Sequence, residues 1–269
     1  MTTLRGRTVV LTGGTGGIGG ALCDALVEAG ARVLAVGRNA ARLQAIADAA
    51  PLGAVQPVEA DLATPEGRAR VIAAAAGRSP ALLLLAHAQP AFGLFEDASS
   101  AELRSLVETN LIAPMLLVHD LLPLLARQPD AAVVAVGSTF GSLAFPGFAA
   151  YSATKFGLRG LFEALAREYD DTGVRFQYLS PRATRTRFNS PGVDALNREL
   201  KVRQDEPTVV ARALVDAIVR GRARLQIGWP ERLFTRINGV LPALVDRNLR
   251  SQLPIIRRHA RPTPQRSHP

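Results

Sequence analysis

The sequence predicts an α/β protein in which helices cover a doubly wound parallel sheet of seven strands. Short apolar runs, typical of strands buried on both faces, alternate along the chain with segments of helical periodicity. A glycine-rich turn, residues 13–20, joins the first of these runs to the first helical segment. The alternation implies parallel strands, because each crossover between parallel neighbours needs a helix-length connection.

The elements follow in regular order along the chain. We predict helices over residues 21–29, from Thr64 with Pro65 at the first helical position, from Ser99 towards Asn110, and over 111–126, 151–170 and 208–220. Residues 182–206 are polar and are predicted to be irregular. The predicted strands are 8–12, 32–37, 54–60, 81–86, 131–136, 174–179 and 225–228.

Length and composition limit the class of protein. The 269 residues, 48% of them hydrophobic and 20% charged, suffice for one domain with a large core. Cys23 is the only cysteine and the four His are scattered, which argues against disulfides and against a metal site. The start of the sequence lacks a signal-peptide pattern, and the apolar run 111–126 is broken by His119 and Asp120. We therefore expect a cytoplasmic protein.

The net charge of +9 is concentrated at the C-terminal end. Residues 231–269 hold eight Arg against Glu231 and Asp246, so this extension carries +6 and the domain of residues 1–230 carries +3. The chain shows no aromatic interleaving of its cations and no zinc spacing, so we expect no nucleic-acid partner.

The extension has apolar residues at helical spacing flanked by Arg. Gly239 and Pro242 are predicted to divide it into two helices, followed by a disordered end. Such helices either pack, across a subunit interface or over the substrate mouth, or lie weakly on an anionic membrane surface. Packing is the favoured alternative.

The glycine-rich turn predicts a dinucleotide site. Glycines let the backbone approach a pyrophosphate, and the following helix N-terminus supplies N–H donors. After the second strand the chain reads Gly37-Arg38-Asn39, with Arg42 one turn later. No carboxylate is present there to bind the ribose of NAD, and Arg suits a 2′-phosphate. NADP(H) is therefore favoured over NAD(H).

Tyr151 and Lys155 are four residues apart and so share one helix face. The chain has three Tyr, and only two Lys against thirty Arg, so the choice of Lys here points to a compact point charge. A free phenol has a pKa near ~10 and an adjacent ammonium lowers it, so the pair predicts a proton-transfer device. The alternative is an interfacial Tyr beside a solvated Lys.

Together these motifs resemble the short-chain dehydrogenase/reductases, in their compact single-domain branch with a Rossmann-type fold. The resemblance runs from about residue 8 to 228 and rests on Thr12, Gly13, Gly17, Gly19, Asp61, Asn110, Ser138, Tyr151, Lys155, Pro181 and Thr186.

The resemblance implies a role for each matching residue. Tyr151 is expected to be the acid/base, and Ser138 to bind the substrate carbonyl. Lys155 is expected to hold the nicotinamide ribose and lower the Tyr151 pKa, and Asn110 to fix a water that links Lys155 to solvent. The residues expected to bind the cofactor are Thr12, Gly13, Thr15, Gly17, Ile18, Gly19, Arg38, Arg42, Asp61, Leu62, Ala88, Tyr151, Lys155, Pro181 and Thr186.

Two positions depart from the family's pattern. His87 and Gln89 stand in the stretch 86–89, where the family often has Asn-Asn-Ala-Gly, and Arg182 follows Pro181 in place of the usual Gly. We expect His87 to pack beside the cofactor rather than act as acid/base, and Arg182 to narrow the loop over the nicotinamide.

The implied function is an NADP(H)-dependent oxidoreductase that interconverts a ketone and a secondary alcohol, with a non-catalytic NADP-binding regulator as the alternative. The apolar residues of segment 182–206 suggest a lipophilic substrate, which would be oxoacyl-, sphingoid- or steroid-like. Its cations would suit the phosphate of an acyl carrier or CoA. The equal alternative is that the segment is a mobile, solvated lid. The apolar set is Phe188, Val193, Leu196 and Leu200, and the cations are Arg185, Arg187, Arg198, Lys201 and Arg203.

The helices 111–126 and 152–170 are apolar over more surface than one sheet face can cover. In the family these two elements form a subunit interface. We therefore expect a homodimer or homotetramer.

Overall fold

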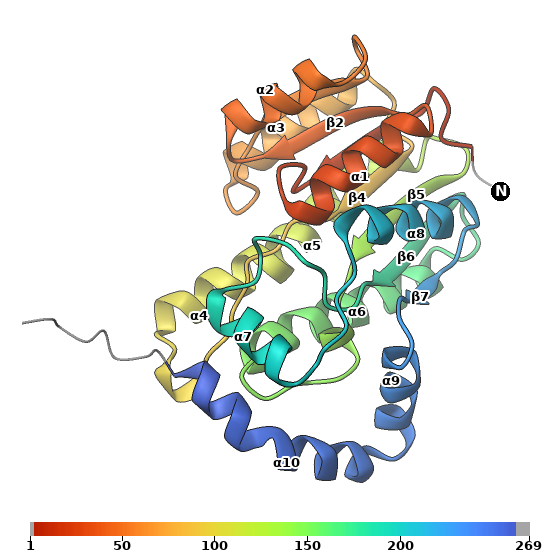
Figure 1. Ribbon diagram of the computed structural model, residues 1–269. Helices are drawn as coiled ribbons and strands as arrows, with labels where there is room; N and C mark the ends of the chain where they lie inside the picture. The colour runs from red at the N-terminus through yellow and green to blue at the C-terminus, as the bar shows by residue number, and fades with distance from the viewer. Residues whose placement is uncertain (1–2, 262–269) are drawn as a thin grey trace, which may run out of the picture.

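The computed structural model describes residues 3–261 and places seven parallel strands in one sheet, in the order β3-β2-β1-β4-β5-β6-β7, between two layers of helices (Figure 1). This confirms the predicted Rossmann-type sheet. The strands are β1 (Thr8–Thr12), β2 (Arg32–Gly37), β3 (Val55–Glu59), β4 (Leu82–Leu85), β5 (Ala131–Val136), β6 (Val174–Ser180) and β7 (Arg224–Gln226).

The strand order reverses between β1 and β4. β1 pairs with β2 on one side and with β4 on the other, so the connections leaving the carboxyl ends of β1 and β4 diverge. A crevice opens at such a switch point, where ligands bind in open α/β sheets. β1, β4 and β5 are buried along their whole length, which explains why their sequences are apolar except for Thr8 and Thr12 at the ends of β1.

Each sheet face carries its own hydrophobic core. On one face, Leu22, Leu26 and Leu214 from α1 and α8 pack against β1 and β4. On the other face, Leu117, Leu121 and further residues of α3, α5 and α6 pack against the same strands. The helices are α1 (Gly17–Glu28), α2 (Ala40–Ala49), α3 (Pro65–Ala76), α4 (Ser100–Val107), α5 (Ala113–Leu125), α6 (Ala149–Glu168) and α8 (Pro207–Val219).

A π-helical turn, Glu108–Ile112, joins α4 to α5 and makes a helical run from Ser100 to Leu125. By length and composition this run could cross a membrane. Its C-terminal half is instead a core helix, because Leu117, Leu121 and Leu125 are fully buried against the sheet.

The segment 182–206 contains a helix that the sequence analysis did not predict. α7 (Pro191–Glu199) is capped by Ser190, whose hydroxyl accepts from the N–H of Val193, and it buries Val193 and Leu196. Its buried residues Val193 and Leu196 do have helical spacing, but a helix of nine residues carries that pattern over only about two turns. The prediction of an irregular segment was therefore wrong for residues 191–199.

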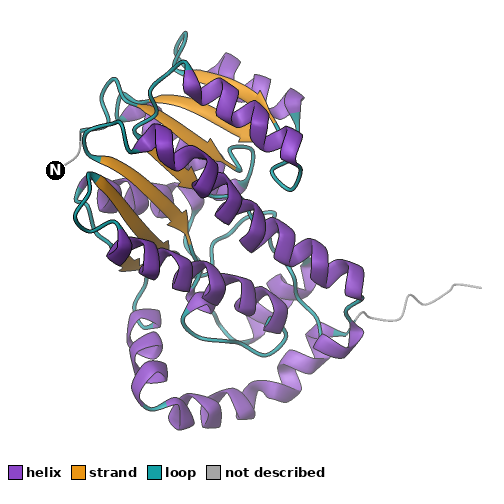
Figure 2. Cartoon of the chain, turned by 180° about the vertical axis from the view of Figure 1, so that it is seen from behind, coloured by secondary structure: helices purple, strands orange, loops and turns teal. Residues whose placement is uncertain are grey.

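The C-terminal extension forms two helices, α9 (Glu231–Val240) and α10 (Pro242–Ala260), as predicted from Gly239 and Pro242. Figures 1 and 2 show them as an L-shaped arm that leaves the sheet after β7 and returns along α7. Ile256 is fully buried, and Glu199 at the end of α7 pairs with Arg258 and with His259 Nε2 (2.7 Å). The predicted disordered end lies mostly in residues 262–269, outside the described residues.

Candidate active site

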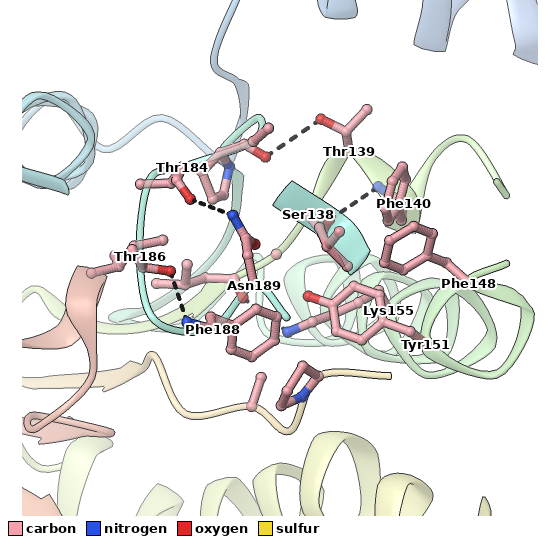
Figure 3. A pocket seen from close by; sticks show the side chains of 18 of the residues that line it. Ser138, Thr139, Phe140, Phe148, Tyr151, Lys155, Thr184, Thr186, Phe188 and Asn189 are labelled. Atoms are coloured by element: carbon pink, nitrogen blue, oxygen red, sulfur yellow. Dashed lines mark hydrogen bonds between the residues drawn. The ribbon is translucent and has the colours of Figure 1, made fainter. Parts of the chain in front are cut away.

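A cavity of about 1010 Å³ lies at the carboxyl ends of the strands, between the sheet and the arm. Figure 3 shows the part around Ser138, Tyr151 and Lys155. Of the predicted residues, those that line the cavity are Gly13, Thr15, Gly17, Ile18, Gly19, Arg38, Arg42, Asp61, Leu62, Ala88, Ser138, Tyr151, Lys155, Pro181 and Thr186.

The glycine turn forms one end of the cavity. Gly13 has φ +69°, and a Cβ there would lie 2.8 Å from the His87 Cα, so only glycine permits this approach. No side chain caps α1 at Gly16, and Gly17, Ile18 and Gly19 of its first turn line the cavity. An uncapped helix N-terminus in a glycine-lined hollow fits the pyrophosphate of a dinucleotide.

Two guanidinium groups lie at the end of β2. Arg38 and Arg42 are exposed and line the cavity, and neither forms an ion pair within residues 3–261. Asn39 caps α2 by accepting from the Arg42 N–H at 2.9 Å, which fixes where the helix starts. Asp61 on the neighbouring loop accepts from the Ala63 N–H at 3.0 Å. The edge of the site is therefore cationic, with one carboxylate beside it.

Ser138, Tyr151 and Lys155 meet at the centre of the cavity. Ser138 follows β5 and its Oγ accepts from the Phe140 N–H at 3.1 Å, whereas Tyr151 and Lys155 project from α6. In Figure 3 the Tyr151 hydroxyl points towards Ser138, with the Lys155 amine beside the phenol ring. Lys155 Nζ lies 5.7 Å from the ring centroid and donates to the Val136 carbonyl at 3.4 Å. The two hydroxyls can contact one ligand oxygen, and the phenol can protonate it.

Burial controls the titration of this pair. It raises the pKa of Tyr151 above its usual value, and a hydrogen bond with Ser138 offsets only part of that rise. Burial also lowers the pKa of Lys155 to about 8. Burial thus sets the direction of the Tyr151 shift in the protein alone, and the predicted lowering of its pKa by Lys155 stays a prediction.

Asn110 lies behind the site and not in it. It is 1% exposed in the π turn, where its Oδ1 accepts from Gln89 N–H at 2.7 Å and its Nδ2 donates to Gln89 O at 3.0 Å. A further bond to Thr154 Oγ1 (3.4 Å) ties it to α6. The structure thus shows Asn110 holding the loop after β4 against the catalytic helix, and it does not bring Asn110 to the cavity wall.

Thr12 is also a supporting residue. It is fully buried, and its Oγ1 accepts from the Ala86 N–H at 3.2 Å and lies 2.6 Å from His87 Nδ1. It does not line the cavity, so any effect on a cofactor passes through Ala86 and His87. This places Thr12 differently from its predicted cofactor contact.

His87 lines the cavity as a neutral imidazole. Burial, and secondarily the charge of Lys155, lower its pKa to about 4. Its Nδ1 is held by Thr12, and its buried Nε2 has no hydrogen-bond partner among the described residues. A ring that stays neutral near pH 7 is poorly suited to donate a proton.

Arg182 lines the cavity and pairs with two carboxylates. Its guanidinium binds Asp205 with two hydrogen bonds, Nε to Oδ2 at 2.8 Å and Nη2 to Oδ1 at 2.6 Å. It also lies 3.6 Å from Glu231 at the start of α9. Arg182 thus joins the loop after β6, the end of the 182–206 segment and the arm, and its predicted narrowing of the loop over the nicotinamide stays a prediction.

The sequence analysis missed an aromatic wall. Six of the ten Phe line the cavity, and the rings pack closely, as with Phe140 and Phe148 at 4.7 Å between centroids. These residues come from separate loops and from the arm, so no local period marks them. They are Phe92, Phe140, Phe145, Phe148, Phe188 and Phe234.

In the segment 182–206, the apolar residues line the cavity and most of the cations do not. Its four predicted apolar residues all line the cavity, but Lys201 and Arg203 alone of its five predicted cations do so. Arg185 instead pairs with Glu206 at the surface. The arm adds Val245, Asn248, Leu249 and Gln252 to the opposite wall.

Comparison with known proteins agrees with this architecture. The family described as short chain dehydrogenase matches residues 7–196, and the chain therefore belongs to the short-chain dehydrogenase/reductase family of oxidoreductases. A short chain dehydrogenase of Pseudocercospora fijiensis is 30% identical over 72% of this chain, which spans 64% of that protein. A 3-ketodihydrosphingosine reductase of Cryptococcus neoformans is 28% identical over 88% of this chain and 76% of its own length.

Solved structures share the whole fold. A short-chain dehydrogenase from Streptomyces avermitilis has a TM-score of 0.78 at 28% identity, covering 94% of this chain and 98% of its own. A structure from Beutenbergia cavernae, described as an NAD(P) dependent gluconate 5-dehydrogenase with bound NADP at low occupancy, has a TM-score of 0.72 at 29% identity. It covers 83% of this chain and 95% of its own.

We predict that Lys155 loses its proton near pH 8. Below that pH the buried amine is charged, and above it the charge is lost while Tyr151, with its raised pKa, stays protonated. The measurement is an NMR titration of lysine side chains labelled at the ε-carbon, with the Lys155→Met variant assigning the signal. A Lys155 signal that titrates only above about pH 10, as in a model peptide, would contradict the prediction.

Proposed function

We propose that the protein is an NADP(H)-dependent oxidoreductase that interconverts a lipophilic ketone and its secondary alcohol. The observation that carries the proposal is the meeting of Ser138, Tyr151 and Lys155 in one buried cavity with an uncapped α1 N-terminus. No observation favours the alternative of a non-catalytic regulator, which would not need a proton donor held at this point.

Ser138, Tyr151 and Lys155 have separate roles in carbonyl reduction. Ser138 and Tyr151 donate hydrogen bonds to the carbonyl oxygen, and these bonds strengthen as negative charge develops on it. Tyr151 then gives its proton to that oxygen, and its raised pKa keeps the proton available until the stronger base forms. The Lys155 ammonium stabilises the resulting phenolate. A nicotinamide cofactor bound in the cavity supplies the hydride.

The preference for NADP(H) rests on charge. Arg38 and Arg42 line the cavity without ion-pair partners among the described residues, so both guanidinium groups are available to a phosphate. The B. cavernae structure, described with bound NADP, shows that a relative accepts this cofactor.

The preference for a lipophilic substrate rests on the cavity wall. The six Phe and the apolar residues of α7 and α10 line the same cavity as Tyr151, and the Phe188 ring lies 6.1 Å from the Tyr151 ring, between centroids. Burial of apolar substrate surface against such a wall is favourable. The 3-ketodihydrosphingosine reductase among the relatives acts on a ketone by its name, which supports this substrate class.

The proposed assembly is a homodimer or homotetramer. Met115 and Phe156 on α5 and α6 are 40% and 41% exposed, and Val107 and Ile112 nearby are also exposed. Apolar side chains gathered on neighbouring helices are typical of a subunit contact.

The Tyr151→Phe variant should lower kcat for ketone reduction by about 10²–10⁴-fold, because it removes the proton donor and leaves the ring. The Kd for NADPH should change by less than about threefold, since the phenol holds little of the cofactor. Stopped-flow reduction of a ketone panel and fluorescence titration with NADPH measure the two quantities, and Tyr169→Phe serves as the matched control. Activity above a few per cent of wild type would remove Tyr151 from the role of acid. A wild type that binds NADPH but reduces no ketone would favour the regulator.

The Arg38→Ala variant should weaken NADPH binding by about tenfold or more, through loss of a charge-assisted bond to the 2′-phosphate. NADH binding should hardly change. Arg70→Ala, which removes an exposed Arg on α3, is the control for net charge. Equal loss of affinity for both cofactors, or a wild type that prefers NADH, would refute the assignment.

Light scattering at micromolar concentration should give two or four times the 28.6 kDa chain mass. A Phe156→Asp variant should lower that mass, because it places a charge in the buried contact, whereas Val209→Asp on α8 should not. A monomeric wild type would show that the exposed residues of α5 and α6 serve no subunit contact.

A further inference from the structure

The corner between α9 and α10 exposes three large apolar side chains together. Val240, Leu241 and Leu244 are 78%, 55% and 59% exposed and do not line the cavity. In Figures 1 and 2 this corner is the part of the arm farthest from the sheet. These three residues, called the apex below, form a compact apolar projection.

Unpaired cations lie along both helices that meet at the apex. Six Arg of α9 and α10 are exposed, and five of them, all but Arg258, form no ion pair or side-chain hydrogen bond within residues 3–261. Of the two acids of the arm, Glu231 faces Arg182, which leaves Asp246 as the one exposed carboxylate. The five are Arg232, Arg236, Arg247, Arg250 and Arg257.

The residues of α10 that line the cavity and the Arg residues of α10 lie on opposite faces of the helix. Val245, Leu249 and Gln252 follow a spacing of four and three, and face the cavity. Arg247 and Arg250 fall between them and lie on the outer face. One helix therefore lines the cavity on its inner side with two apolar residues and two amides, and presents cations on its outer side.

We propose that the apex and the five unpaired Arg form a docking surface for an anionic lipid bilayer. The apex would enter the boundary between headgroups and acyl chains, while the Arg side chains pair with anionic headgroups. A second copy of the chain fits this surface poorly, because a twofold contact would place the unpaired Arg of one copy against those of the other.

A consequence follows that rests on the proposed function. A lipophilic ketone dissolved in the bilayer would reach the cavity from the side of the molecule that touches the membrane. Catalysis on such a ketone should then depend on docking, whereas catalysis on a small water-soluble ketone should not.

The test is co-sedimentation of the full chain with vesicles of phosphatidylcholine, with and without phosphatidylserine. The wild type should bind the anionic vesicles and be released by salt, because headgroup attraction is screened beyond a Debye length of about 8 Å at physiological ionic strength. Leu241→Asp should weaken binding by at least about tenfold. Arg247→Gln and Arg250→Gln should each weaken it by about fivefold.

Matched controls lie elsewhere on the molecule. Leu52→Asp alters a fully exposed leucine in the loop before β3, and Arg70→Gln removes an exposed cation of α3. Both should bind vesicles like the wild type, and thermal melting verifies that all variants fold. Absence of wild-type binding to anionic vesicles, or equal binding by apex and control variants, would overturn the proposal. A lower oligomer mass for Leu241→Asp with unchanged vesicle binding would show the apex to be a subunit contact instead.

An activity assay separates this proposal from the proposed function. With a long-chain ketone held in anionic vesicles, Leu241→Asp should lose kcat/KM in proportion to its loss of binding, and keep wild-type rates on a water-soluble ketone. If the wild type reduces neither ketone, the proposed function fails while the sedimentation result still decides the docking surface.

Discussion

The close approach of two backbone turns at the ends of β1 and β4 is the constraint on which the rest of the site depends. Gly13 has no side chain and a positive φ, so its turn can lie against the backbone of residues 86 and 87. The Thr12 hydroxyl forms hydrogen bonds with both of these residues, the Ala86 N–H and His87 Nδ1. A Cβ on Gly13 would separate the two turns and widen the crevice in which a dinucleotide fits.

The same loop links this turn to the catalytic helix through hydrogen bonds. Gln89 is held by Asn110, Asn110 also binds Thr154, and Thr154 donates to the carbonyl of Tyr151 at 2.8 Å. The path runs from β1 through the π turn to α6, one residue before Lys155. Asn110 therefore positions the catalytic pair relative to the cofactor turn, although it touches neither.

Desolvation gives the pair its chemistry. An ammonium removed from water holds its proton less tightly, and a phenol removed from water holds its proton more tightly. Tyr151 therefore remains a neutral acid, and Lys155 titrates close to neutral pH instead of staying charged over the whole accessible range. The aromatic residues and α7 that line the cavity also offer apolar surface to a substrate, so the same lining serves both purposes.

Arg182 connects that cavity to the arm. The Arg182 side chain is 10% exposed and pairs with Asp205 and Glu231, which belong to two separate segments. Its neighbour Pro181 lines the cavity. Removal of either carboxylate would leave a largely buried cation less well paired, which is costly. The arm is thus anchored at its start by this cluster and at its end by Ile256 and Glu199.

The sequence by itself determined the features that depend on the spacing of nearby residues. Alternating apolar runs and helical segments predicted all seven strands, the glycine turn predicted the dinucleotide end of the site, and a separation of four residues placed Tyr151 and Lys155 on one helix face. Gly239 and Pro242 marked the break between α9 and α10, because both residues act on the backbone of their own segment.

Only the tertiary structure decided what depends on residues far apart in the chain. The direction of the Tyr151 pKa shift follows from burial by loops that no local pattern links to α6. Arg182 turned towards Asp205 and Glu231, which lie more than twenty residues away in sequence. Six phenylalanines spread over residues 92–234 line one cavity, since the hydrophobic effect favours burial without regard to chain separation. The spacing of residues in the sequence therefore identified the reactive groups. The packing of distant segments decided the protonation states of those groups and their contact partners.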